Sequence, residues 1–315
     1  MLAGCGPKLS LNLTTVNTVG AMHVGNFQTA SYSTSWIDAT SSQYGTPIFI
    51  TCGFMDGSVP YFGGRNTSNA VDIQPSFWKN GDVTQLADSG SVEAIYVLRG
   101  DVYSSGYIIR NKAKVPVFWK NTTMVELQSA IQATTKKIYV FGSDVYVAGF
   151  DNGEAVYWKN GSKVGLGLPL QITDMAVASG DVHIVGYTLN NLAFHWQGGN
   201  VTNLPLSSGA TTGKANSIFI DGSDIYIAGE ASNGSTSTAI YWKNGATTVL
   251  SDGTRAVSIT KSDADIYVLG YAINQSSPFA VPVYWKNNEQ KAMQIDDSHQ
   301  FEVFHFTAVN LKNQL

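Results

Sequence analysis

Charged side chains are scarce in this chain of 315 residues. Asp, Glu, Lys and Arg make up 13% of it, against about a quarter of a typical soluble domain. The 19 basic residues are scattered and the net charge is −4, so the sequence offers no basic stripe of the kind that a nucleic-acid groove needs. Long apolar runs are also missing, so we expect no membrane-spanning segment.

Motifs of common catalytic and metal sites are missing too. The chain has no His-Glu-x-x-His, no Gly-x-Ser-x-Gly, no phosphate-binding loop and no zinc-ligand spacing. Turns such as Asp221–Asp224 hold too few carboxylates for a calcium loop, so an Asp that caps its own turn explains them better. We therefore expect no cofactor and no metal. The sequence leans away from an enzyme without deciding the point.

The residues that are abundant favour an all-β fold. Hydrophobic residues make up 43% of the chain, which is enough for a core. Its 31 Gly, 15 Tyr, 14 Phe and 7 Trp indicate many short strands joined by tight turns. No helical period appears over any useful length.

An internal repeat organises the chain, and its clearest copy contains Tyr157-Trp158-Lys159-Asn160-Gly161. Each unit contains one tryptophan. A second motif precedes it and reads Asp, apolar, Tyr, two small or apolar residues, Gly, as in Asp144–Gly149. The tryptophans lie 38 to 46 residues apart at Trp36, Trp78, Trp119, Trp158, Trp196, Trp242 and Trp285.

One repeat unit predicts four short strands. In the sixth unit they cover Ser217–Ile220, Asp224–Gly229, Ala239–Trp242 and Thr247–Leu250. The first two strands and the last two are joined by Gly and Asn turns that suit tight hairpins. Four strands in about 40–45 residues are typical of a β-propeller blade. Seven tryptophans predict a seven-bladed propeller, with six or eight blades as alternatives.

The chain ends predict how the ring closes. Phe301–Val309 has the pattern of a first strand with no further strands after it, whereas the first unit has only Met22–Asn26 and Tyr32–Trp36. We expect the C-terminal strand to complete the first blade. The predicted organisation is a lead-in over residues 1–17 and one propeller domain over 18–315.

Most repeated residues have a structural interpretation. Each Trp is expected to pack between neighbouring blades. The repeated Lys of the Trp-Lys pair is expected to be solvated and to discourage edge pairing. His183 and His195 replace aromatic residues of the repeat and are expected to pack like them.

The units resemble the Tyr-Val-Ala-Gly … Tyr-Trp-Lys-Asn-Gly repeats of bacterial secreted and lipoprotein propellers. The resemblance covers about residues 20–310 and implies the fold and a binding role in the cell envelope or outside the cell. It says little about activity.

The N-terminal residues Leu2-Ala3-Gly4-Cys5 resemble the lipobox of bacterial lipoproteins, in which the Cys carries the lipid. The charged and apolar regions that precede a lipobox are missing before it, so either the leader has been removed or the match is chance. With Cys5 lipidated, Cys52 is an unpaired, buried small hydrophobe. A Cys5–Cys52 disulfide is the alternative.

The site is predicted on the face where the repeats differ. Links between blades lead into the innermost strands at the channel mouth, and in a chain poor in charge they carry charged residues. The predicted ligand-binding residues are Glu93, Lys137, Asp174, Lys214, Arg255 and Glu302.

Two functions follow from this face. The first is a non-enzymatic binding or scaffold propeller of the bacterial envelope, extracytoplasmic and anchored by lipid at Cys5. It is expected to be a monomer, with a protein or glycan partner, no nucleic acid, and no membrane contact beyond the anchor. The alternative is a glycan-acting hydrolase or lyase that uses carboxylates at the mouth.

Overall fold

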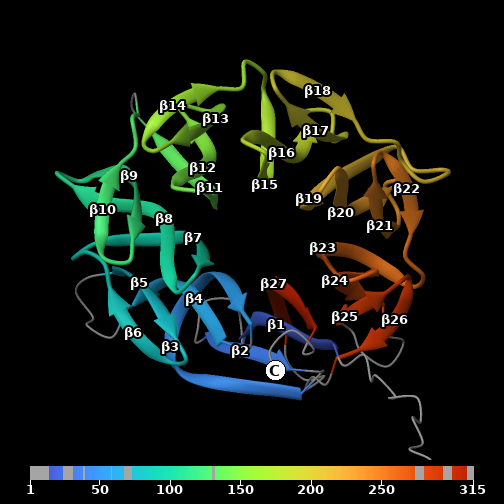
Figure 1. The fold of residues 1–315 in the computed structure, drawn as a ribbon, viewed down its shortest axis with the longest axis horizontal. Helices are drawn as coiled ribbons and strands as arrows, with labels where there is room; N and C mark the ends of the chain where they lie inside the picture. The colour runs from blue at the N-terminus through green and yellow to red at the C-terminus, as the bar shows by residue number, and fades with distance from the viewer. Residues whose placement is uncertain are drawn as a thin grey trace, which may run out of the picture.

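The computed structural model describes residues 14–23, 31–37, 40–57, 59–66, 73–129, 132–273, 280–293 and 300–310, with side chains described between residues 49 and 293. In these ranges the chain is all-β and antiparallel, with one seven-stranded sheet and five four-stranded sheets. The sheets stand around a common centre (Figure 1). None of the described residues forms a helix that could cross a membrane.

The strands fall into four groups by their place in a sheet. The innermost strands are β3 (Thr40–Asp56), β7 (Gly90–Leu98), β11 (Ala133–Phe141), β15 (Leu170–Ala178), β19 (Thr212–Asp221), β23 (Gly253–Ser262) and β27 (Gln300–Asn310). The second strands are β1 (Thr14–His23), β4 (Val59–Asn66), β8 (Asp101–Arg110), β12 (Asp144–Asp151), β16 (Asp181–Thr188), β20 (Asp224–Ser232) and β24 (Asp265–Ala272).

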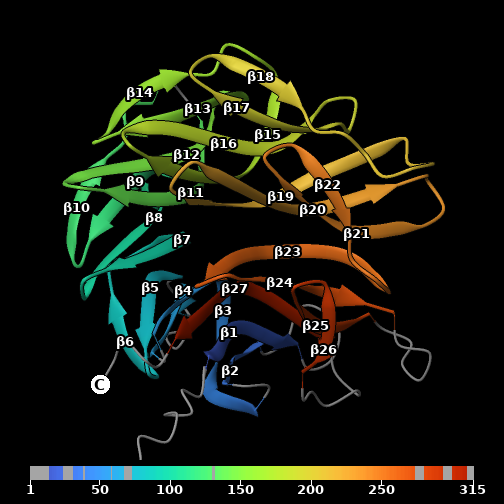
Figure 2. The same cartoon turned by 45° about the vertical axis from the view of Figure 1, so that its right-hand side comes forward.

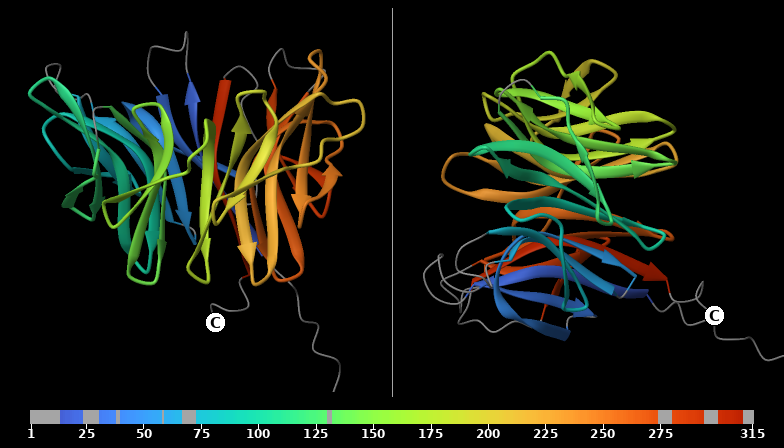
Figure 3. Two further views of the ribbon diagram at one scale, coloured as in Figure 1. Left: turned by 90° about the horizontal axis from the view of Figure 1, so that it is seen from above. Right: turned by 90° about the vertical axis from the view of Figure 1, so that its left-hand side faces the viewer.

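The third strands are β2 (Ser31–Ile37), β5 (Gln74–Lys79), β9 (Ala113–Lys120), β13 (Glu154–Lys159), β17 (Ala193–Gln197), β21 (Ser237–Lys243) and β25 (Val281–Lys286). The outermost strands are β6 (Asp82–Gln85), β10 (Thr123–Glu126), β14 (Ser162–Gly165), β18 (Asn200–Asn203), β22 (Ala246–Val249) and β26 (Glu289–Ala292). The predicted four-strand unit is confirmed, and its strands run between the two faces of the molecule (Figure 3).

The innermost strands contact one another in chain order from β3 to β27, and β27 in turn contacts β3. Figure 2 shows β27 between β23 and the first strands of the chain. The predicted role of the C-terminal strand is confirmed at the level of pairing, because β27 pairs with β1 from Thr14↔Asn310 to His23↔Gln300. β3 pairs with β2 through residues 40–48 and with β4 through residues 48–56.

The second strand of the first unit was predicted at Met22–Asn26 and lies at Thr14–His23 instead. The predicted lead-in over 1–17 therefore overlaps this strand. Its glycine is Gly20, which pairs with Val303 where the register shifts. In the next unit Gly64 has the equivalent pairing with Ile50. The first unit was misplaced because its copy has lost the Asp by which the motif was aligned.

The tryptophans form the core between sheets, as expected. The six whose side chains are described are at most 5% exposed: Trp78, Trp119, Trp158, Trp196, Trp242 and Trp285. Three of them also donate a hydrogen bond to the link that precedes their sheet, as Trp158 Nε1 does to the Gln128 carbonyl at 2.6 Å. Each of these three Trp residues therefore fixes the start of its own sheet against the end of the preceding one.

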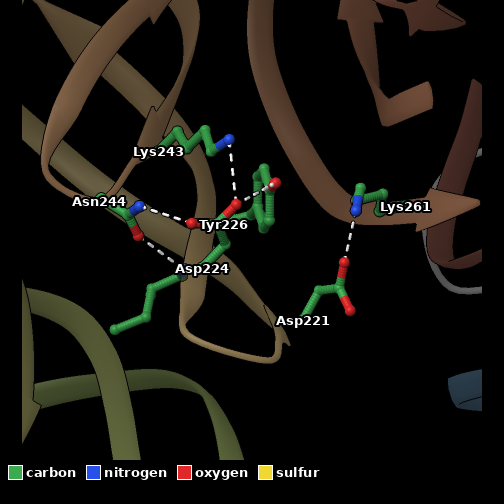
Figure 4. Close-up of polar contacts among 7 residues, drawn as sticks. Asp221, Asp224, Tyr226, Lys243, Asn244 and Lys261 are labelled. Carbon is green, nitrogen blue, oxygen red and sulfur yellow. Dashed lines mark hydrogen bonds and ion pairs between the residues drawn. The ribbon is translucent and has the colours of Figure 1, made fainter. Parts of the chain in front are cut away.

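The repeated Lys has a partner that its pattern did not predict. Lys243 Nζ lies 3.0 Å from Asp224 and 5.4 Å from the centre of the Tyr226 ring. Asn244 Nδ2 donates to the same carboxylate at 2.8 Å, and Asn244 Oδ1 accepts from the backbone of Ile225 (Figure 4). We call this arrangement the hairpin network. It recurs at Asp101, Asp144 and Asp265.

The Asp of the hairpin network therefore holds the third strand against the second, and its expected role as a cap of its own turn was wrong. Asn244, with a Lys beside it, lowers the pKa of Asp224 to about 2. The pair is exposed, so its contribution to stability is small. Asn244 also has a φ of 48° and is followed by Gly245 at 82°, which are the dihedrals of the predicted tight hairpin.

Candidate functional site

The innermost strands enclose a central cavity of about 450 Å³. Its described lining comes from β3, β7, β11, β15, β19 and β23. Polar and charged side chains lie near the beginnings of these strands, and aromatic side chains lie further along them. The beginnings of the strands are the end that the variable links reach, which we call the mouth.

Every innermost strand carries one extra residue at the same level. The register with its second strand shifts by one residue there, which is a β-bulge. We call this residue the bulge residue. The six described bulge residues that line the cavity are Thr51, Glu93, Lys136, Thr173, Asn216 and Val257. β27 has the same shift opposite Gly20.

The bulge explains the glycine of the repeat. The bulged backbone comes so close to the second strand that a Cβ on Gly149 would lie 2.0 Å from the Thr134 carbonyl oxygen. The corresponding distances at Gly64, Gly106, Gly186, Gly229 and Gly270 are 1.8 to 2.1 Å. No side chain fits there, so the glycine is needed for close backbone approach and not for a turn. The bulge in turn directs one side chain per strand into the cavity.

Three of the bulge residues tie their strand to the next one. Thr51 Oγ1 donates to the Val92 carbonyl, Thr173 Oγ1 donates to the Ala215 carbonyl at 2.6 Å, and Asn216 Nδ2 donates to the Ala256 carbonyl at 2.8 Å. In each case the acceptor is the residue just before the next bulge. We call these bonds the inter-strand ties. They join backbone carbonyls next to the bulges to the neighbouring strand.

Glu93 and Lys136 occupy the same level without making a tie. A carboxylate cannot donate to a carbonyl, and Lys136 is exposed at the mouth. Arg255, two residues before the Val257 bulge, is also exposed and lines the cavity. No ion pair joins these three charges to any described side chain. Among the described side chains they are therefore charged groups that line the cavity without an ion-pair partner.

Asp174 is the most enclosed charge in the cavity, and it has a structural role. Its side chain is 6% exposed, and its Oδ1 accepts from the Met175 backbone at 2.8 Å and lies 3.1 Å from Lys137 Nζ. Its Oδ2 accepts from the Ile218 backbone at 3.0 Å. One carboxylate thus joins β11, β15 and β19. Removing one partner of a buried, hydrogen-bonded carboxylate is costly, so Asp174 holds these three strands together.

The deeper part of the cavity is aromatic. The rings of Phe54 and Tyr96 are 5.1 Å apart, and those of Tyr96 and Tyr139 are 5.0 Å apart. Phe219 lines the cavity further round. Burial raises the pKa of both tyrosines, with the contact to Tyr139 adding to the effect on Tyr96. Both therefore present neutral hydroxyl groups near neutral pH.

Cys52 lies in the cavity wall beside Thr51. Its thiol is free, and burial raises its pKa to about 12. A thiol of that pKa is a poor nucleophile. The expected burial of Cys52 is met only in part, because the residue as a whole is half-buried. Cys5 lies outside the described residues.

The structure brings together four of the six predicted ligand-binding residues, because Glu93, Lys137, Asp174 and Arg255 all line the cavity. Lys214 does not join them. Its Nζ lies 4.9 Å from the centre of the Tyr187 ring, beside a separate cavity of about 250 Å³. Glu302 belongs to β27, and its side chain is outside the described set.

The links between sheets were the predicted location of these residues, and that was wrong. All six belong to the innermost strands themselves. The bulge interrupts the alternation of apolar residues, so the sequence pattern revealed only the second half of each strand. Thr51, Lys136, Thr173, Asn216 and the two tyrosines were not among the predicted site residues. A usable signal exists, since each bulge residue precedes the glycine of its unit by thirteen positions.

The fold defines a class of protein, the β-propeller-like domains. No protein-family model matches the chain, and none of the curated proteins does. Among solved structures it is similar to a puromycin-hydrolyzing peptidase of Mycobacterium tuberculosis, with 8% identity and a TM-score of 0.57 over 88% of this chain and 53% of that one. It is also similar to an acylaminoacyl peptidase of Pyrococcus horikoshii, with 11% identity and a TM-score of 0.55 over 90% and 51%.

A third similar structure is the extracellular domain assigned to a one-component system of B. thetaiotaomicron, with 12% identity and a TM-score of 0.51 over 80% of this chain and 37% of that one. The chain spans about half or less of the length of these proteins. The matched regions are β-propeller domains. At such low identity the likeness shows the fold alone.

Proposed function

We propose that the chain is a non-enzymatic binding protein that holds a small polar ligand, such as a glycan unit, at the mouth of its central cavity. The observation that carries the proposal is the break in the inter-strand ties. Thr51, Thr173 and Asn216 use their bulge positions to join strands, whereas Glu93 and Lys136 leave charged groups facing the cavity. Where some copies of a repeat lack a structural hydrogen bond that other copies make, a functional reason is expected.

The cavity has the chemistry of a polar-ligand site. Its volume of about 450 Å³ falls within the roughly 300–1,000 Å³ that small-molecule sites occupy. Lys136 and Arg255 can donate, Glu93 can accept, and Tyr96 and Tyr139 offer aromatic edges and hydroxyls deeper in the cavity. Sugars combine hydroxyl groups with apolar ring faces, which suits this lining.

Seven blades are part of the proposal. Two observations support this number over six or eight. The bulge recurs in seven innermost strands, β3 and β27 included, each time opposite a glycine. The long strand β3 also pairs on its two halves with different strands, so it can end one blade and begin the next.

The carboxylates favour binding over glycan hydrolysis. A glycosidase needs two carboxyl groups that can each take part in the reaction. Both oxygens of Asp174 are already held by backbone donors, and one also by Lys137. Among the described side chains of the cavity this leaves Glu93 as a free carboxylate.

An extracytoplasmic location with a lipid anchor at Cys5 completes the proposal. The lipobox-like Leu2-Ala3-Gly4-Cys5 supports it, and the extracellular domain among the similar structures is compatible with it. The check is metabolic labelling with an alkyne fatty acid of the protein expressed behind a lipoprotein signal peptide. Label is expected in the wild type and should be absent from Cys5→Ser.

The ligand proposal is tested by a glycan array read with wild type and the triple variant Glu93→Gln, Lys136→Gln, Arg255→Gln. We expect the variant to lose the wild-type signals while its melting curve stays close to wild type, because none of the three residues makes an ion pair with a described side chain. Arg99→Gln, Lys112→Gln, Glu154→Gln removes the same charges from exposed positions, two in turns and one at the start of β13, and should bind normally. Unchanged binding by the cavity variant would contradict the proposed site.

A further inference from the structure

The sheet of β15–β18 departs from the hairpin network at every side chain except the Asp. Where the neighbouring sheet has Tyr146, Tyr157, Lys159 and Asn160, this sheet has His183, His195, Gln197 and Gly198. Only the Asp is kept, as Asp181. The other four-stranded sheets all keep the Asp, Lys and Asn of the network, so this sheet departs from it furthest among them.

These changes collect polar side chains on one face of three strands. His183 pairs with Gln197 and Val185 pairs with His195, so both histidines and Gln197 point to the same side. Asn200 and Thr202 of β18 lie opposite Gln197 and His195. Beside them is a cavity of about 330 Å³, which Asp181, His195, Gln197, Gly198, Asn200 and Thr202 line.

The two imidazoles meet through their ring nitrogens. His183 Nδ1 lies 2.9 Å from His195 Nε2, and the ring planes differ by 5° with centres 5.1 Å apart. A hydrogen bond between ring nitrogens requires an N–H that points at a lone pair, so the rings meet edge to edge. Burial lowers the pKa of both rings, that of His195 to about 4, with His183 as a second cause. Both imidazoles are neutral near pH 7, which is the form that binds metals.

Asp181 lacks the bonds to Lys and Asn that the corresponding Asp makes in the other four-stranded sheets. In the complete networks each Asp lies 2.7 to 3.0 Å from a Lys and an Asn. Asp181 has only Gln197 Nε2, at 3.5 Å. It stands two residues before His183 on the same face of β16, and its charge acts on that ring. A carboxylate with a single long hydrogen bond thus lies beside two neutral imidazoles.

We propose that His183 Nδ1 and His195 Nε2 bind a divalent transition-metal cation of the Zn²⁺ or Cu²⁺ type, with Asp181 and water as further ligands. Imidazole suits these ions. Two nitrogens on one tetrahedral zinc ion lie about 3.3 Å apart, given Zn–N bonds of about 2.0–2.1 Å. The pair at 2.9 Å therefore has to part by only a few tenths of an ångström, with the rings turning toward the cavity.

Metal binding requires the proton of the hydrogen bond between the two rings to move to another nitrogen. The imidazole that donates it changes tautomer and carries the hydrogen on its other nitrogen, so each ring offers one lone pair to the metal and no net proton is released. Asp181 completes the site by a side-chain rotation, since no three His, Cys, Asp or Glu of the described side chains are already gathered as a metal site.

The test is titration of the tag-free protein with Zn²⁺ by calorimetry and with Cu²⁺ by electron paramagnetic resonance. We expect one saturable site per chain, and nitrogen hyperfine structure from two imidazoles in the Cu²⁺ spectrum. His183→Tyr, His195→Tyr restores the residues of the neighbouring sheet and should fold while losing the site. Asp181→Asn should weaken binding by at least about tenfold, since even changes outside the ligand set cost that much.

A control that removes another histidine, His299→Gln, should bind like the wild type. Absence of saturable binding to the wild-type protein would overturn the proposal. So would wild-type affinity in the double variant, because the metal would then be held by other groups.

Discussion

At the scale of single residues, the glycine of the repeat and the bulge residue depend on each other. The bulge brings the innermost strand so close to the second strand that only hydrogen fits at Gly149. The same bulge presents Lys136 to the cavity. A residue that looks like a turn-former in the sequence is therefore part of the device that builds the cavity wall.

We predict that Gly149→Ala destabilises the protein by about 3 kcal/mol or more, in the range of severe backbone and overpacking effects. Its Cβ would lie 2.0 Å from a carbonyl oxygen that cannot withdraw. Chemical denaturation measures the change. Gly165→Ala is the matched control, because a Cβ there has no atom within 4 Å. It should be neutral or stabilising by up to about 1 kcal/mol.

The histidine pair predicts a pH dependence of stability. The pKa of His195 falls from an ordinary value of 6.5 to about 4 on folding, and that of His183 falls too. Between these values the unfolded chain binds more protons than the folded one, so stability is complete above pH 6.5 and is lost as the pH falls toward 4. Melting temperatures measured with a chelator present should show this decline.

His183→Tyr, His195→Tyr should have a flatter profile between pH 6.5 and 4. The exposed carboxylates of the hairpin networks titrate lower, since the pKa of Asp224 is lowered from 3.8 to about 2. The stability that these carboxylates contribute should be lost only at pH values below the range of 6.5 to 4, and to the same extent in both proteins. Equal decline of both proteins between pH 6.5 and 4 would show that other groups dominate there.

At the scale of the strand and hairpin, Asn160 performs two functions. It takes a φ of 50° in the turn between β13 and β14, and its side chain bonds to both Val145 N and Asp144. Asn160→Gly keeps the turn but loses the bonds, at a cost of about 1 kcal/mol. Asn160→Ala also strains the backbone and should cost about 1–2 kcal/mol more. Equal costs in urea denaturation would argue against the turn contribution.

Strands with local signals could be predicted from the sequence, and strands with long-range causes could not. The second and third strands carry Asp-x-Tyr and Tyr-Trp-Lys, which report local turns and packing, and they lie where expected. The innermost strands begin earlier than expected, because a bulge breaks the apolar alternation on which the prediction rested. The first unit was misplaced because β1 has Thr15 and Asn17 where the motif has Asp and Tyr.

The scarcity of charge in the sequence predicted part of the site, and the structure corrects which residues belong to it. As expected, four charged residues gather at the central cavity: Glu93, Lys137, Asp174 and Arg255. Asp174, however, is a structural anion bound by two backbone groups, and Lys214 belongs to another cavity. Which side of a strand a residue faces depends on register past the bulge, and the sequence pattern does not encode that register.

At the scale of the molecule, β27 links the two ends of the chain. It pairs with β1 and contacts both β23 and β3. We predict that a chain without residues 300–315 no longer unfolds in the single cooperative transition of the full-length protein. It should also associate, because β1 becomes an open sheet edge. Calorimetry and light scattering measure these changes. A deletion of 311–315 alone is the control and should behave like the full chain.

The bulge residue that lines the cavity and the glycine that fixes its backbone are separate positions in the sequence, which affects how this scaffold can change. Each of the six described bulge residues brings its side chain to the cavity from a position whose backbone is fixed by a glycine thirteen residues later, so identity and placement are set independently. The central wall is therefore a circle of exchangeable positions. A new binding preference could arise by single substitutions around that circle, through gene variation or by design, while the hydrogen-bonded ladders behind it stay the same.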